Sequence, residues 1–157
     1  MSDVVYLTKE RIKEIEEELF GLKTRGRREI AQKIADARSH GDLSENSEYD
    51  AAKQEQELHE LKISRLEMMI AKAQIISADE LPNDKIYILT KVKLKNLKND
   101  AILEYMMVSP GEADFEKRKL SVDSPVGKAL MGKKIGDIAE ITAPAGKVQY
   151  EVLEIGK

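Results

Sequence analysis

The chain has 157 residues, of which 35% are charged and only 4% are aromatic, and its formal net charge is −3. This length suits one or two small domains. So much charge with so few aromatic side chains argues against one large core and is typical of a coiled coil. The absence of cysteine excludes disulfides and thiolate metal sites. There is no signal-peptide pattern and no apolar run of membrane-spanning length, so we expect a cytoplasmic protein without a membrane contact.

Apolar residues in the first long segment, from about Thr8 to His40, recur at alternating spacings of three and four. This spacing predicts a helix whose apolar seam pairs in a coiled coil. The seam positions are Ile12, Ile15, Leu19, Leu22, Gly26, Ile30, Ile34 and Ala37, with Ile34 one residue late. Gly21 and Gly26 each cost about 1 kcal/mol relative to alanine inside a helix. We therefore expect a bend or a close helix approach near them.

A second helical segment, from about Glu45 to Ser77, has a more regular seam. Its positions are Tyr49, Ala52, Gln56, His59, Ile63, Leu66, Ile70 and Ala73. Polar seam residues usually fix register, and we interpret His59 in this way rather than as a catalytic group. Two such helices joined by a few residues must fold back as a long antiparallel hairpin, with Asp42 and Glu45 at its far end.

Charge is segregated along the two predicted helices. Residues 23–38 contain six Lys/Arg and two acidic residues, and residues 42–60 contain seven acidic residues and one lysine. One interpretation is ion pairing between solvated helix faces. The other is a basic strip that attracts a nucleic-acid backbone by counterion release. The acidic chain as a whole argues against tight independent binding to DNA.

The composition changes near Leu81-Pro82, and we place a domain boundary between residues 1–80 and 81–157. The first part contains 13 Lys/Arg and 18 Asp/Glu, a net of −5, and the second contains 13 and 11, a net of +2. Short β-branched runs then predict strands. These runs cover residues 86–94, 102–108, 138–142 and 148–155.

Between these strands the sequence predicts one short helix. Ser124 is placed to be its N-cap, Pro125 its first residue, and Gly132 its terminator after Met131. The second domain is thus predicted to be a small α+β domain with a mostly antiparallel sheet. It contains neither histidine nor cysteine and shows no catalytic constellation, so it is interpreted as a docking module.

The acidic turn between the two helices allows two interpretations. Gly41 can end the first helix in a left-handed conformation, and Asp42 and Glu45 have the spacing of a capping box. Alternatively, the two carboxylates donate to a metal. Mg²⁺ is commonly held by one or two carboxylates together with phosphates and water. Two exposed carboxylates cannot complete such a site, but they could complete one whose other ligands belong to a partner.

Several long motifs resemble those of the Gre family of bacterial transcript cleavage factors, and the resemblance covers essentially the whole chain. They are the tip residues 41–49 with Ala51-Ala52-Lys53, then Ala73-Gln74-Ile75-Ile76, Glu112-Ala113-Asp114-Phe115, residues 121–130 and Gly132-Lys133. Leu43 and Ala51-Ala52 favour the GreA branch of the family over the GreB branch.

The resemblance implies a bacterial RNA polymerase as partner and an FKBP-like fold for the second domain. In this family the hairpin enters the polymerase secondary channel, and the polymerase cleaves the extruded RNA 3′ end of a backtracked complex. The protein is then a monomer and not an enzyme by itself. It has no cofactor in isolation and acts on Mg²⁺ in the polymerase active site.

By the same resemblance, Asp42 and Glu45 are the metal-directed acids. The nascent RNA 3′ end would face Arg38, Asn46, Ser47, Tyr49 and Lys53, although Tyr49 also lies on the seam. Polymerase docking would involve Asp114, Phe115 and Pro125. Two alternatives stay open at this point. One is a channel-binding transcription inhibitor of the same fold, and the other is a coiled-coil adaptor in which the turn only caps a helix.

Overall fold

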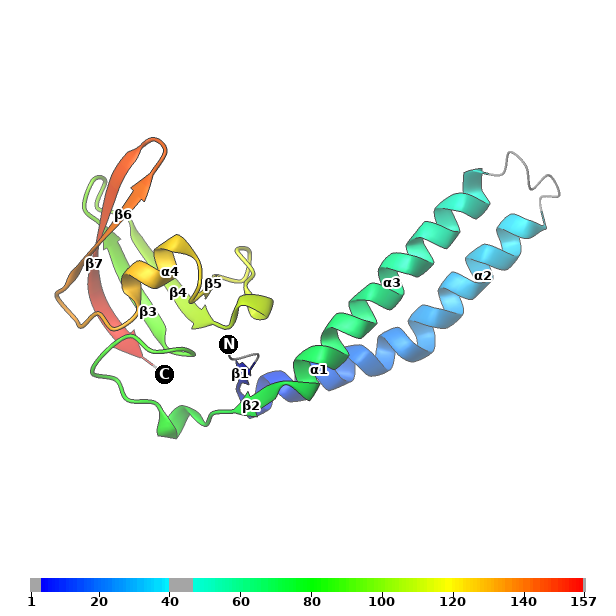
Figure 1. Cartoon of the computed structure of the whole chain (residues 1–157), viewed down its shortest axis with the longest axis horizontal. Coiled ribbons are helices and arrows are strands. Elements are labelled where there is room, and N and C mark those ends of the chain that lie inside the picture. The colour runs from blue at the N-terminus through cyan, green and yellow to red at the C-terminus, as the bar shows by residue number, and fades with distance from the viewer. Residues whose placement is uncertain (1–3, 40–46, 157) are drawn as a thin grey trace. The chain divides into compact units, whose positions relative to one another are not determined.

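The computed structural model describes residues 4–39 and 47–156, which belong to two compact units (Figure 1). One unit comprises Glu10–Lys72 and is helical, and the other combines Met1–Lys9 with Ala73–Lys157. The predicted α+β architecture, a long helical hairpin and a small sheet domain with a short helix, is confirmed. The functional boundary between residues 80 and 81 stays a prediction.

The hairpin consists of two arms. The first contains α1 (Lys9–Gly21), a π-helical turn (Leu22–Gly26) and α2 (Arg27–Arg38), and the second is α3 (Ser47–Ala71), which lies beside the first arm (Figure 1). With 25 residues, α3 is about 37 Å long at 1.5 Å per residue. None of the helices within residues 4–39 and 47–156 is long and apolar enough to span a membrane.

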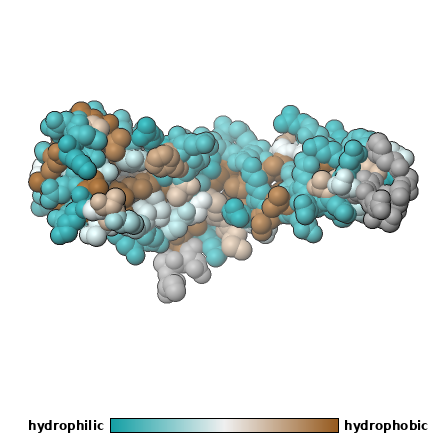
Figure 2. Space-filling model, turned by 90° about the horizontal axis from the view of Figure 1, so that it is seen from above, coloured by the Kyte–Doolittle hydropathy of each residue, from teal (hydrophilic) through white to brown (hydrophobic). Residues whose placement is uncertain are grey.

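The predicted apolar seam holds the arms together. Every predicted seam position in the described part of the arms is buried or half-buried. The most deeply buried seam residues are Ile15, Leu19, Ile30, Ala37, Ala52, Ile63 and Leu66. The remaining surface of the arms is largely hydrophilic in the view of Figure 2. The arms are thus stabilised by a narrow apolar stripe between charged faces.

The second arm ends earlier than the sequence predicted. α3 stops at Ala71, and Ala73–Ile75 forms β2, which pairs in parallel with β1 (Val5–Leu7). The prediction of a helix as far as Ser77 is therefore wrong. Helical spacing alone could not reveal that the β-branched residues after Gln74 have a strand partner about 70 residues earlier in the chain.

The second unit is built around a five-stranded sheet in the order β5-β4-β3-β7-β6. The strands are β3 (Lys91–Asn96), β4 (Ile102–Val108), β5 (Lys119–Ser121), β6 (Ile138–Ala143) and β7 (Gly146–Gly156). Only the β4–β5 pairing is parallel among the described pairs of this sheet. The helix α4 (Pro125–Leu130) contributes Leu130 to a core with Val92, Leu94 and Met107.

The start of β3 corrects the sequence analysis. Residues 86–90 were predicted as strand, but the strand begins at Lys91. The Thr90 hydroxyl donates to the Tyr87 carbonyl oxygen at 2.7 Å, and Leu89 has a φ of 70°. These residues form a turn before the strand. A left-handed conformation is uncommon for leucine. Because position 89 holds neither glycine nor asparagine, the sequence did not indicate a turn there.

Candidate functional site

The described end of the hairpin is closed by a contact between its two arms. α2 ends at Arg38 and α3 begins at Ser47, so the segment with Asp42 and Glu45 connects these helix ends. Arg38 Nη2 donates to the Tyr49 hydroxyl at 3.4 Å, and Arg38 Cζ lies 5.5 Å from the centroid of the Tyr49 ring. The hydrogen bond and the positive charge of Arg38 lower the pKa of Tyr49.

Three of the predicted tip residues, Asp42, Glu45 and Asn46, lie outside the described residues. Ser47 is exposed at the first position of α3. Lys53 is also exposed, one helical turn beyond Tyr49, and its Nζ donates to Gln56 at 3.0 Å. Tyr49 is half-buried on the seam, so it packs between the arms as well as contacting Arg38.

Most of the basic strip is used for ion pairs. Cross-arm pairs join Lys23 to Glu67 at 2.7 Å, Arg27 to Glu60 at 2.8 Å and Lys33 to Glu55 at 2.8 Å. Arg25 lies 3.9 Å from Glu29 on its own arm. The hydrogen bond from Arg27 lowers the pKa of Glu60. Exposed pairs of this kind contribute little to stability.

The two remaining cations of the strip differ from these four. Within residues 4–39 and 47–156, no ion pair joins Arg28 or Arg38 to a carboxylate. The ion-paired interpretation thus accounts for most of the strip. Of these two cations, Arg38 lies at the described end of the hairpin, where it contacts Tyr49.

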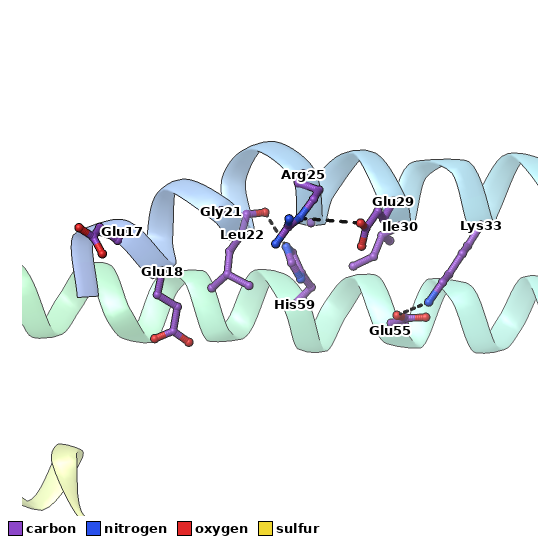
Figure 3. A pocket seen from close by; sticks show the side chains of 11 residues that line it. Glu17, Glu18, Gly21, Leu22, Arg25, Glu29, Ile30, Lys33, Glu55 and His59 are labelled. Atoms are coloured by element: carbon purple, nitrogen blue, oxygen red, sulfur yellow. Dashed lines mark hydrogen bonds and ion pairs between the residues drawn. The ribbon is translucent and has the colours of Figure 1, made fainter. Parts of the chain in front are cut away.

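A second site lies where the first arm changes from α- to π-helix (Figure 3). His59 Nε2 lies 2.8 Å from the Leu22 carbonyl oxygen, which also accepts the Arg27 N–H. Because a carbonyl only accepts, Nε2 carries the proton. A cavity of about 410 Å³ opens beside this contact, with Glu29 and Lys33 among its lining residues. His59 therefore joins the two arms through a hydrogen bond to the backbone, and its role in fixing register stays a prediction.

Gly26 faces the His59 ring, and this contact gives a testable prediction. A Cβ on Gly26 would lie 2.5 Å from His59 Cε1, whereas a Cβ on Gly21 would meet nothing within 4 Å. Gly21→Ala should stabilise the hairpin by up to about 1 kcal/mol. Gly26→Ala should cancel that gain or destabilise, because overpacking costs about 1–3 kcal/mol. Chemical denaturation of both variants measures the difference.

The background variant His59→Ala is the control for that comparison. With the ring removed, Gly26→Ala should become as favourable as Gly21→Ala. If the two alanine substitutions differ equally with and without His59, the ring contact does not constrain Gly26.

The predicted docking residues lie in two parts of the sheet unit. The Asp114 carboxylate accepts the backbone N–H groups of Glu116 at 3.1 Å and Lys117 at 3.4 Å, so it holds its own turn. Phe115 follows it with 78% of its surface exposed. Pro125 is exposed at the first position of α4. Phe115 and Pro125 present apolar surface to solvent, and the Asp114 carboxylate stabilises its own turn. A docking role for these three residues stays a prediction.

No group of three or more potential metal-ligating side chains occurs within the part of the chain that the structure describes.

Two family models match the sequence. The N-terminal model of the transcription elongation factors matches residues 5–75, and the GreA/GreB C-terminal model matches residues 81–157. The chain belongs to the GreA/GreB family of transcription elongation factors.

Curated relatives agree with this assignment. Transcription elongation factor GreA of Chlorobaculum parvum is 51% identical over 156 residues, covering 99% of this chain and 98% of that protein. GreA of Amoebophilus asiaticus is 45% identical over 155 residues, with 99% coverage of both. Among solved structures, the transcription factor Gfh1 is 29% identical and covers all of both chains with a TM-score of 0.48.

GreA/GreB factors bind RNA polymerase and stimulate its intrinsic cleavage of the transcript. The polymerase is the catalyst, and the factor is not itself an enzyme. The acidic motif of the sequence lies in the segment that joins α2 to α3, at the end of the hairpin.

Proposed function

We propose that this protein inserts its hairpin into the secondary channel of RNA polymerase and uses Asp42 and Glu45 to promote cleavage of a backtracked RNA 3′ end. The observation that carries the proposal is the paired arms. The seam continues from Ile15 to Ala37 on one arm and along α3 on the other, and Arg38 and Tyr49 still touch at its end. A stalk of this kind can carry two carboxylates into a buried centre.

The chemistry of the two acids fits Mg²⁺, although they are too few to hold the ion alone. Carboxylate oxygens are its usual protein ligands, and the ion keeps open positions for phosphates and water. Asp42 and Glu45 would be the residues that hold it, and the polymerase would contribute the other ligands. When bound there, Mg²⁺ activates water and stabilises charge in phosphoryl transfer. This chain's own contribution is to deliver and orient the acids.

A cleavage assay on stalled elongation complexes tests the proposal. Adding the protein to backtracked complexes should shorten the RNA from its 3′ end and restore elongation when nucleotides are supplied. Slower elongation without RNA shortening would instead support the channel-binding inhibitor. No effect on either reaction would support the adaptor, in which the turn only caps a helix.

The cations at the hairpin end provide a further prediction about RNA contact. We expect Arg38→Ala and Lys53→Ala to weaken crosslinking to the extruded RNA segment. They should also reduce the salt dependence of cleavage, because a variant with fewer phosphate contacts releases fewer counterions when the RNA binds. Arg25→Ala is the matched control, because Arg25 is exposed on the same arm and pairs within its helix. Equal salt slopes for all three variants would assign Arg38 and Lys53 to a solvated face.

The sheet unit has a separate role, which is to bind the polymerase. We propose that it binds the polymerase through exposed apolar residues that include Phe115 and Pro125, and that the factor acts as a cytoplasmic monomer. The separation into a helical unit and a sheet unit supports this division of labour.

A further inference from the structure

A shallow pocket on the sheet unit is rich in positive charge. It has a volume of about 290 Å³ and is lined by residues of β3, β4 and the turn before β5. Its charged and aromatic lining residues are Lys91, Glu104, Tyr105, Lys117, Arg118 and Lys119. Four of these six side chains are cationic and only Glu104 is acidic, so the pocket is strongly biased toward an anionic ligand.

The cations of this pocket are not neutralised by neighbouring carboxylates. Elsewhere on the same sheet, Lys93 pairs with Glu154 at 3.5 Å and Lys95 pairs with Asp100 at 3.6 Å. Among the described residues, no ion pair involves Lys91, Lys117, Arg118 or Lys119. Arg118 Cζ instead lies 5.9 Å from the centroid of the Tyr105 ring. Its positive charge is held at the pocket without being cancelled.

The turn that supplies three of the cations is held by several hydrogen bonds. The Arg118 N–H donates to the Phe115 carbonyl oxygen at 3.1 Å, and the Arg118 carbonyl oxygen accepts the Met106 N–H at 2.9 Å. Asp114 and Lys119 exchange two backbone hydrogen bonds of 2.9 and 3.0 Å. These bonds fix the backbone from which the three cationic side chains extend.

Lysines at a sheet edge can also serve only to prevent edge-to-edge pairing. β5 is an edge strand of three residues, and Lys119 fits that role. Edge protection does not account for Lys91, which lies on the inner strand β3. It also does not account for Arg118, which lies in the turn before β5, with a φ of 58°, and not on the edge strand itself. All four cations nevertheless line one pocket, and this clustering points to a ligand.

We propose that this pocket binds an acidic segment of a protein partner, which under the function proposed above is RNA polymerase. Lys91, Lys117, Arg118 and Lys119 bind its carboxylates, and Phe115 on the same turn contacts an apolar residue beside them. A protein segment fits better than nucleic acid. The half-buried Tyr105 is covered by Arg118, so it offers no free face on which a base could stack.

The test measures binding of the fluorescently labelled full-length chain to core RNA polymerase. We expect the double variant Lys117→Glu with Arg118→Glu to bind at least about 10-fold more weakly, since like charges then face the acidic segment. The control double variant Lys98→Glu with Lys134→Glu carries the same net charge on exposed residues of the same unit. It should bind as the wild type does. Glu104→Gln should tighten binding by about twofold, because it removes the one acidic side chain of the pocket.

Matched melting curves for the two double variants exclude unfolding as the cause of weaker binding. Equal affinities for the two double variants would overturn the proposal. So would single-stranded oligonucleotide binding by the wild type that is lost in the Lys117/Arg118 variant, because it would assign the pocket to nucleic acid. The measurement does not depend on cleavage. A factor that binds through this pocket but fails to stimulate cleavage would contradict the proposed function of the hairpin end and leave the pocket assignment standing.

Discussion

Asp42→Asn and Glu45→Gln are each expected to reduce stimulated RNA cleavage by at least about 100-fold, the scale of losing one group that stabilises charge in a transition state. Both substitutions keep the side chain close to its original size and remove one negative charge. An amide oxygen is a weaker Mg²⁺ ligand than a carboxylate. The measurement is the rate of RNA shortening in a purified backtracked complex, at saturating factor and over a range of Mg²⁺ concentrations.

The same variants separate the two interpretations of the acidic turn. Asparagine is as good an N-cap as aspartate, so Asp42→Asn should leave the melting temperature nearly unchanged. Binding to the polymerase should also be preserved, because the seam and the sheet unit are untouched. An Asp42→Asn protein that cleaves at the wild-type rate at limiting Mg²⁺ would show that the acid acts only on the helix end.

Glu48→Gln is the matched control for these variants. Glu48 lies in the first turn of α3, close in sequence to the acidic pair, and is exposed. Its substitution removes the same charge from the same end of the hairpin. If it impairs cleavage as strongly as Glu45→Gln, the general negative charge of the tip matters rather than two particular carboxylates.

The hairpin was predictable because its determinants are periodic and local. The 3-4 spacing of apolar residues identified both arms, and the glycines at 21 and 26 flagged the place where the helix becomes π-helical. Ser124 was predicted as an N-cap, and its hydroxyl accepts the Gly127 N–H at 3.0 Å. Such signals depend on neighbours within a turn or two, so a single sequence contains them.

Features that depend on distant parts of the chain were not predictable in this way. β2 needs β1 as its partner, and the turn at Leu89 is held by a hydrogen bond of its N–H to the Met107 carbonyl oxygen. The cationic pocket was also missed. Lys117, Arg118 and Lys119 are consecutive in the sequence, but Lys91 joins them only through the pairing of β3 with β4. For the candidate site, sequence motifs supplied the acids and the structure supplied the contact of Arg38 with Tyr49.

Gly127→Ala should be among the most destabilising single substitutions in the sheet unit, although helix propensity alone predicts the opposite sign. Gly127 lies within α4, where alanine would normally gain about 1 kcal/mol over glycine. However, a Cβ on Gly127 would collide with the carbonyl oxygen of Ser121. Because that atom belongs to the backbone, it cannot move aside as a flexible side chain could. We expect a loss of at least about 3 kcal/mol.

The collision would also break a local hydrogen-bond chain. The Ser124 hydroxyl donates to the Ser121 carbonyl oxygen at 2.7 Å and accepts the Gly127 N–H, so any shift of α4 disturbs both bonds. Differential scanning calorimetry should show the sheet unit melting about 10 °C or more below the wild type. Polymerase affinity should fall with it, since Pro125 begins the displaced helix. Gly156→Ala is the control, because its Cβ would meet nothing within 4 Å. If both alanine variants melt together, the close approach of α4 to Ser121 is not a constraint on this fold.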